Sequence, residues 1–415
     1  RIIVAGLIAL SCLPGTASAA QSEVDILLDK LVEKGILTNV EAGLIRKEIS
    51  ETKETRNKEL AKEIVPDSAR NWKWKGDLRL RDEIRNREGT GNDHHRQRIR
   101  LRIGAEGKVS DNLKAAFRIA TGSTTDPIST NQSFNTFFNK KTIVLDQASL
   151  QYTPEVPGLD KLALTGGIME KPLWTVGPLV WDGDLSWDGG AVQLSEDLGM
   201  IELFSNAGLF SLDTEETESA SLWVLQGGAA VQPFEDMDAE LLKELKLTAA
   251  MAYHDYRNVA NSAKAGTDPL TNFATNTAGA KDFNQLNPSF ELASKVSGLP
   301  VATYLDWVHN TSAGSENNDG VQIGLKLGKA TKPWSFTEGW EAGYFFQELQ
   351  ANAAFDEFVD SDFNGGGTNN RGHAFWVTLA TLKNSTFGAK FLMGENLKGA
   401  KDVEERLQLD WMTKF

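Results

Sequence analysis

The sequence predicts an all-β transmembrane barrel of about 16 antiparallel strands, preceded by a short N-terminal helical segment. Three observations support this fold class. Most of the chain alternates apolar and polar residues with a period of two, the connections between these segments alternate between short and long, and the last such segment ends on an aromatic residue. Together they indicate strands with one apolar and one polar face.

The composition argues against one broad class of function. The 415 residues carry a formal net charge of -14, so the arginine-rich stretches are local basic islands in an acidic protein. A general nucleic-acid binder needs a surface that attracts phosphate. We therefore expect no nucleic-acid partner.

Residues 1–19 have the pattern of a secretory signal peptide. Ile2 to Leu13 form a short apolar region, and Ala17-Ser18-Ala19 is a small-residue cleavage motif. Cleavage there removes Cys12, the single cysteine. A lipid-bearing Cys12 is the alternative, although Ala9-Leu10-Ser11 is a poor lipobox. No later segment reaches the ~18 apolar residues of a spanning helix, so the exported chain is either soluble or crosses a membrane as strands.

Residues 20–66 are predicted to form a periplasmic helical segment. The first helix has one apolar face, made of Val24, Leu27, Leu28 and Leu31. Gly35 ends this helix, and the capping box Thr38-x-x-Glu41 opens a second, more charged one. The second helix carries a thin apolar stripe, which is either the seam of a coiled coil or one face of a solvated helix. Pro66 ends the region.

From residue 72 to residue 415 the helical period gives way to alternation, which predicts the barrel. In residues 98–103, for example, three arginines alternate with Ile99, Leu101 and Ile103. A period of two places the two sets on opposite faces of a sheet. The predicted strands are 72–82, 96–108, 113–121, 142–153, 161–169, 189–196, 200–210, 219–234, 245–256, 288–297, 300–310, 319–329, 338–349, 373–381, 386–394 and 404–415.

The connections between these strands alternate in length. The short ones include 110–112, 197–199, 297–298 and 382–385. The long ones include 83–95, 122–141, 170–188, 257–287 and 350–372. Short turns at one end and long loops at the other are typical of a bacterial outer-membrane barrel, in which every backbone group in lipid is paired. A β-sandwich and a propeller are the soluble alternatives, and no blade-length repeat supports the propeller.

The C-terminal strand is amphipathic up to its last residue. One face is apolar and comprises Leu407, Leu409, Trp411 and Phe415. A terminal aromatic residue that closes such a strand resembles the signal read by the outer-membrane barrel insertion machinery, although Thr413 departs from the usual apolar residue at its position. We therefore predict this machinery as a partner.

Four segments resemble the bacterial putative-porin family. They are LLDKLVEKGIL (27–37) with Glu41-Ala42, WKGDLRLR (74–81), LDQASLQY (145–152) and WDGDL (181–185). The resemblance implies an outer-membrane porin in outer-membrane lipid, through which small hydrophilic solutes or ions diffuse passively. It also implies no cofactor and, by analogy with general porins, a homotrimer. Asp146 departs from clean alternation, so we expect a strand irregularity or a subunit contact there.

Basic residues on the polar faces of three neighbouring strands predict one positively charged wall. A barrel of about 16 strands is wide enough for an aqueous lumen. If the apolar faces meet lipid, the pore-lining basic residues are Lys75, Arg79, Arg81, Arg98, Arg100, Arg102, Lys114 and Arg118.

The third long loop, 170–188, is the candidate for a constriction. It is too apolar for a freely solvated loop, and it carries Asp182, Asp184 and Asp188. In general porins, which this chain resembles, the third loop folds into the lumen and its carboxylates face wall arginines, so we expect these aspartates to face the basic wall. Alternatively, the loop caps the outside and the arginines are solvated or pair with local acids. Those acids are Asp77, Asp82 and Glu106.

Other chemical motifs are weak. Residues 360–365 copy the first half of a calcium loop, but Arg371 stands where a bidentate glutamate is required, so we expect an ordinary surface loop. The chain contains neither H-E-x-x-H nor G-x-S-x-G, and we predict no enzymatic activity and no metal site. The alternatives are an outer-membrane barrel hydrolase, and a structural barrel whose helical segment binds periplasmic partners.

Overall fold

The structure is a computed structural model in which the chain divides into two compact units, Arg1–Arg70 and Asn71–Phe415. Each unit is described by itself. The predicted signal peptide, residues 1–19, lies outside the described residues. The structure describes residues 23–48, 52, 71–89, 93–135, 137–214, 219–234, 237, 240–259, 276, 283–312 and 316–415.

The N-terminal unit contains the two predicted helices. The first, α1 (Glu23–Glu33), is followed by Gly35 with a φ of 69°, a left-handed conformation that suits a helix end. Residues 39–48 form the second helix. Its capping box is confirmed: the Thr38 N–H donates to Glu41 Oε2 at 2.8 Å, and the Glu41 N–H donates to Thr38 Oγ1 at 3.2 Å. The large apolar side chains that stay exposed on this unit are Leu27, Ile36, Val40 and Leu44.

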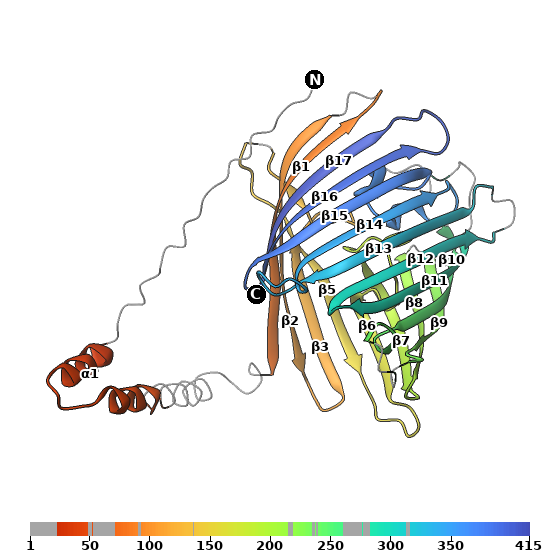
Figure 1. The fold of residues 1–415 in the computed structure, drawn as a ribbon. Coiled ribbons are helices and arrows are strands. Elements are labelled where there is room, and N and C mark those ends of the chain that lie inside the picture. The colour runs from red at the N-terminus through yellow and green to blue at the C-terminus, as the bar shows by residue number, and fades with distance from the viewer. Residues whose placement is uncertain are drawn as a thin grey trace. The chain divides into compact units, whose positions relative to one another are not determined.

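The second unit is a single antiparallel sheet closed into a barrel (Figure 1). Seventeen strands are named in its described residues, and one of them, β4, is only two residues long. The prediction of about 16 strands is therefore confirmed. The strands are β1 (Trp72–Arg87), β2 (His94–Lys108), β3 (Leu113–Thr121), β4 (Gln132–Ser133), β5 (Ile143–Tyr152), β6 (Lys161–Glu170), β7 (Ser186–Asp197), β8 (Ile201–Asp213), β9 (Ala220–Val231), β10 (Lys246–Arg257), β11 (Phe283–Val296), β12 (Leu299–Asn310), β13 (Asp319–Ala330), β14 (Gly339–Leu349), β15 (Asn370–Leu382), β16 (Ser385–Asn396) and β17 (Glu404–Lys414).

The first and last long strands close the barrel. β1 pairs with β2 on one side and with β17 on the other, so Leu80 lies beside both Ile99 and Trp411. Beyond the end of β17, Gly76 and Phe415 exchange two backbone hydrogen bonds of 2.8 and 3.0 Å. Apart from β4, every strand of the described residues has a partner on both sides, so the sheet they form has no open edge.

The two ends of the barrel differ as the alternation of connections predicts. One end, here called the short-turn end, has tight hairpins such as Ser297-Gly298, where both residues have positive φ values (51° and 75°) as a type I′ turn requires. The other, the long-loop end, carries loop 171–185 between β6 and β7 and loop 350–369 between β14 and β15. Two short elements, η2 (Asp356–Phe358) and η3 (Phe363–Gly365), lie in the latter loop.

The inner and outer faces of the barrel have opposite polarity. Exposed apolar side chains occupy alternate positions on the outside, for example Leu325 on β13 and Val377 on β15. Buried polar side chains occupy the positions between, for example Gln322 and Gln347. The apolar exterior suits lipid, and the interior is polar. No described helix is long and apolar enough to cross a membrane.

Candidate pore constriction

Loop 171–185 folds into the barrel and packs on its inner wall. Trp181 is only 2% exposed, and its ring centroid lies 4.5 Å from that of Trp187 on β7 and 5.2 Å from that of His254 on β10. Both partners are buried and alternate with exposed residues on their strands, which places them on the inner face. Large buried aromatic rings therefore hold the loop inside the lumen rather than above its mouth.

Polar inner-wall residues also bind the backbone of this loop. Gln226 on β9 accepts a 2.9 Å hydrogen bond from the Trp174 N–H and donates a 2.8 Å bond to the Trp174 carbonyl. On β13, Lys326 Nζ donates to the Val176 carbonyl at 3.0 Å. These bonds satisfy loop backbone groups that would otherwise be buried without partners. The loop is thereby attached to the side of the barrel formed by the middle strands.

Loop 350–369 also enters the barrel and contacts loop 171–185. Ala353 and Ala354 are fully buried, and Phe358 stacks on Trp181 with ring centroids 6.0 Å apart. The Asp182 N–H donates to the Phe358 carbonyl at 2.7 Å. The expectation of an ordinary surface loop at residues 360–365 is therefore wrong, because Val359 directly before this stretch and Phe363 within it are buried in apolar clusters.

Asp184 connects loop 171–185 to the basic wall. Its Oδ1 lies 3.3 Å from Arg100 Nη1 and 3.4 Å from Arg102 Nη1, and both arginines also pair with Asp77. Thr130 supports the same carboxylate from its backbone N–H (3.2 Å) and its hydroxyl (2.9 Å). Burial by itself would raise the pKa of Asp184, but the nearby arginine charges outweigh it and hold the pKa below its usual value.

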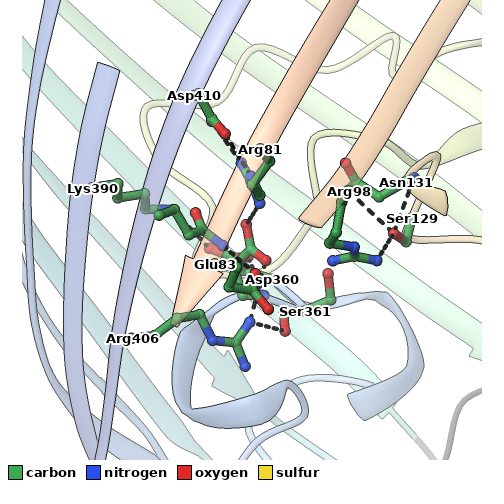
Figure 2. Close-up of polar contacts among 12 residues, drawn as sticks. Arg81, Glu83, Arg98, Ser129, Asn131, Asp360, Ser361, Lys390, Arg406 and Asp410 are labelled. Carbon is green, nitrogen blue, oxygen red and sulfur yellow. Dashed lines mark hydrogen bonds and ion pairs between the residues drawn. The ribbon is translucent and has the colours of Figure 1, made fainter. Parts of the chain in front are cut away.

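Asp362 connects loop 350–369 to the same wall from the side of β17. Figure 2 shows the arginines of this region, Arg81 and Arg406, together with Asp410. The Asp362 carboxylate lies 3.0 Å from Arg81 Nη1 and 3.3 Å from Arg406 Nη1, while Arg81 also pairs with Asp410 at 2.7 Å. Burial opposes ionisation, yet the charges of Arg81, Lys390 and Arg406 hold the pKa of Asp362 well below its usual value. Two loops thus present carboxylates to one arginine wall.

Asp182 and Asp188 do not lie where the sequence predicts. Asp182 is buried between the two loops, where it accepts backbone N–H bonds from Asp184 (2.8 Å) and Ser361 (3.0 Å). Burial, reinforced by the carboxylates of Asp360 and Asp184, raises its pKa well above the usual value. Asp188 is in β7, exposed on the face opposite Trp187. The expectation that both face the basic wall is corrected, because the buried rings turn the chain between them.

Three of the predicted wall residues lie toward the short-turn end. Lys75, Lys114 and Arg118 line a cavity of about 610 Å³ there. Lys75 pairs with Glu106 at 3.1 Å, so local acids do partner part of the wall, as the alternative interpretation proposes. Asp82, in contrast, contacts His95. The wall therefore divides into a solvated vestibule and a more buried part beside the two loops, in which Arg81, Arg100 and Arg102 form ion pairs.

The expected strand irregularity at Asp146 is confirmed. The pairing of β3 with β5 shifts register between Arg118 and Ile119, which face Gln147 and Leu145 and leave Asp146 as the extra residue. The bulge turns the Asp146 carboxylate onto Arg118, with which it forms an ion pair. An acid that simple alternation would place on the lipid face thus becomes a partner of the wall.

The relationship of the chain to known proteins agrees with this geometry. A family model described as "Putative porin" matches residues 83–303 and 300–415. The chain belongs to this porin family. No curated protein matches the sequence.

Solved porin structures share the barrel fold at low sequence identity. Pseudomonas putida OprB, in its high-pH structure, is 11% identical with a TM-score of 0.54, over 83% of this chain and 94% of that chain. Salmonella typhi OmpF in complex with daunomycin is 11% identical with a TM-score of 0.48, over 83% and 97% of the two chains. The similarity to OprB supports the fold, and family membership identifies an outer-membrane porin that passes solutes by diffusion.

The structure brings to the arginine wall residues that the sequence analysis missed, above all Asp362 and its partner Arg406. The sequence of loop 350–369 contained a signal that could have predicted these residues. Loop 350–369 contains the apolar residues Ala353, Ala354 and Phe358, so like loop 171–185 it is too apolar to be fully exposed to water. Applying the same criterion to both loops would have predicted that both fold inward.

Proposed function

We propose that this porin allows passive diffusion of small hydrophilic solutes or ions through a waist between the arginine wall of β1, β2 and β17 and the carboxylates of loops 171–185 and 350–369. The observation that carries the proposal is the placement of Asp184, which a loop inside the barrel brings within 3.4 Å of both Arg100 and Arg102. The two loops fill the side of the lumen with apolar side chains. Solutes are therefore directed along charged and polar groups, which favour hydrated solutes over apolar ones.

A planar lipid bilayer tests the channel directly. Purified full-length protein is expected to produce stable, stepwise increases in conductance, because the lumen is polar and closed off from lipid by a complete sheet. Heat-unfolded protein is the matched control and is expected to give no steps. If the folded protein produces none where a control porin conducts, the channel proposal fails.

The proposal includes export and assembly. Residues 1–19 act as signal peptide, residues 20–66 lie in the periplasm, and barrel-insertion machinery reads the C-terminal strand before the barrel enters outer-membrane lipid. Exposure of Trp411 and Phe415 supports recognition of the C-terminal strand by the insertion machinery.

We further propose that the porin forms a homotrimer. Asp188 is exposed on the outer face of β7, where a carboxylate would be unfavourable against lipid, and this supports a subunit contact there.

Deletion of residues 21–64 tests the role of the N-terminal unit. If its exposed apolar side chains form a coiled-coil seam, deletion is expected to abolish an SDS-resistant oligomer while the single-channel conductance of the barrel stays the same. The point variant Val40→Glu, which leaves the length unchanged, is expected to act in the same direction. Electrophoresis without heating measures the oligomer. An oligomer unchanged by both variants would leave the segment only a tethering role.

A further inference from the structure

Two arginines of the wall differ from all the others that the structure describes. No carboxylate oxygen of the described residues lies within 4.0 Å of Arg79 or Arg98, whose hydrogen-bond partners are Asn131 and Ser129. Every other arginine in the described ranges lies within 3.9 Å of a carboxylate oxygen. Both exceptions are half-buried, and the Nε of each is buried without a hydrogen-bond partner. A guanidinium removed from water without an anion is unfavourable unless something else compensates its charge.

The two unpaired arginines converge on one short segment. Because Arg79 faces Arg100 and Arg98 faces Arg81 across the β1–β2 ladder, Arg79 and Arg98 are diagonal neighbours on the inner face. Arg79 Nη2 donates to Asn131 Oδ1 at 2.6 Å, and Arg98 Nη2 lies 3.4 Å from Ser129 Oγ. Figure 2 shows Arg98 beside Ser129 and Asn131.

The nearby carboxylates are held by other partners. Asp184 is fixed by Thr130, the residue between Ser129 and Asn131, and its Oδ1 faces Arg100 and Arg102. On the other side, Arg81 pairs with Asp410 and Asp362. The loop acids therefore pair with the arginines around this pair, whereas within the described part of the chain Arg79 and Arg98 themselves hydrogen-bond to neutral side chains.

We propose that Arg79 and Arg98, with Ser129 and Asn131, form an oxyanion-binding position in the lumen that holds the carboxylate or phosphate group of a passing solute. The proposal rests on the proposed function, since the lumen is the path by which such a solute arrives. Guanidinium groups bind carboxylates and phosphates through paired N–H donors, and the Ser129 hydroxyl adds a donor or acceptor. A cation would be repelled by two positive charges, and a neutral solute would leave them uncompensated.

Equilibrium binding to the detergent-solubilised full-length protein tests the position without requiring transport. Isothermal titration with inorganic phosphate, and separately with acetate, is expected to show saturable binding to the wild type. In Arg79→Gln/Arg98→Gln the affinity is expected to fall by about tenfold or more, since both charged donors are lost. Arg79→Lys/Arg98→Lys keeps the charge without the planar donor pair, and an intermediate affinity is expected.

Arg257→Gln is the matched control. Arg257 pairs with Asp255 and lies 4.3 Å over the ring of the exposed Trp223, on the outer face, so phosphate affinity is expected to stay unchanged. Heat-modifiable electrophoretic mobility checks that each variant is folded. Absence of saturable binding to the wild type, or equal binding to the folded double glutamine variant, overturns the oxyanion position, even if the protein conducts. Binding that depends on Arg79 and Arg98 without bilayer conductance supports the position and contradicts the proposed channel.

Discussion

Asp184→Asn is expected to shift the ion selectivity of the porin toward anions. The substitution removes one negative charge from the waist and leaves Arg100 and Arg102 with Asp77 as their acidic partner. A unit charge about 7 Å from a permeating ion in water changes the electrostatic energy of that ion by roughly 0.6 kcal/mol. This energy corresponds to a change of about threefold in the permeability of the cation or of the anion. The reversal potential across a bilayer in a salt gradient measures this shift.

Neutralising Arg98, Arg100 and Arg102 together is expected to shift the ion selectivity the opposite way, toward cations.

Asp188→Asn is the matched control for the Asp184→Asn prediction. It makes the same chemical change three residues beyond loop 171–185, on the outer face of β7, so the reversal potential is expected to stay at the wild-type value. Because arginine charges hold the pKa of Asp184 below its usual value, the wild type should also keep its selectivity as pH falls to about 4. An unchanged reversal potential in Asp184→Asn would show that loop 171–185 does not form the waist.

Trp181→Ala is expected to release loop 171–185 from the inner wall. The side chain is buried among Trp187, His254 and Phe358, and removing so large a buried ring typically costs about 3–5 kcal/mol. That loss acts on the packing of the two loops, whereas the barrel sheet keeps all its hydrogen bonds. We therefore expect a folded barrel with larger and noisier single-channel conductance.

The control for the loop prediction is Trp307→Ala. Trp307 is on β12 with 40% of its side chain exposed on the outer face, so the substitution leaves the lumen unchanged. Its conductance is expected to equal that of the wild type. If Trp181→Ala also conducts like the wild type and with the same noise, the aromatic cluster does not restrict the passage.

The strands of this porin are predictable from local pattern, and their ends are not. Each long strand was anticipated, since alternation with a period of two follows directly from backbone geometry. β1, however, continues to Arg87, beyond the predicted end at residue 82, because its pairing with β17 runs on to Arg87 and Glu404. The end of β1 is set by the last paired residue, whereas the alternation of apolar and polar residues that predicts the strand stops earlier in the sequence.

The contacts of the loops, in contrast to the strands, are mostly not predictable from local sequence. An apolar loop with three aspartates predicted an inward fold near arginines, yet only Asp184 reaches them. Which carboxylate faces the wall depends on how Trp181 and Trp187 pack, and that involves strands far apart in sequence. The contact between Asp362 and Arg81, 281 residues apart, has no local signature at all.

The sequence by itself determined the barrel, the polarity of its two faces and the basic character of one wall, because each depends on a repeat that neighbouring residues carry. Only the tertiary structure decided which of those charges are neutralised. Arg98 and Arg100 look alike in an alternating stretch, but Asp184 reaches Arg100 and not Arg98. Ion pairing depends on distances of a few ångströms between loops and wall, and these distances exist only once the loops have packed inside the barrel.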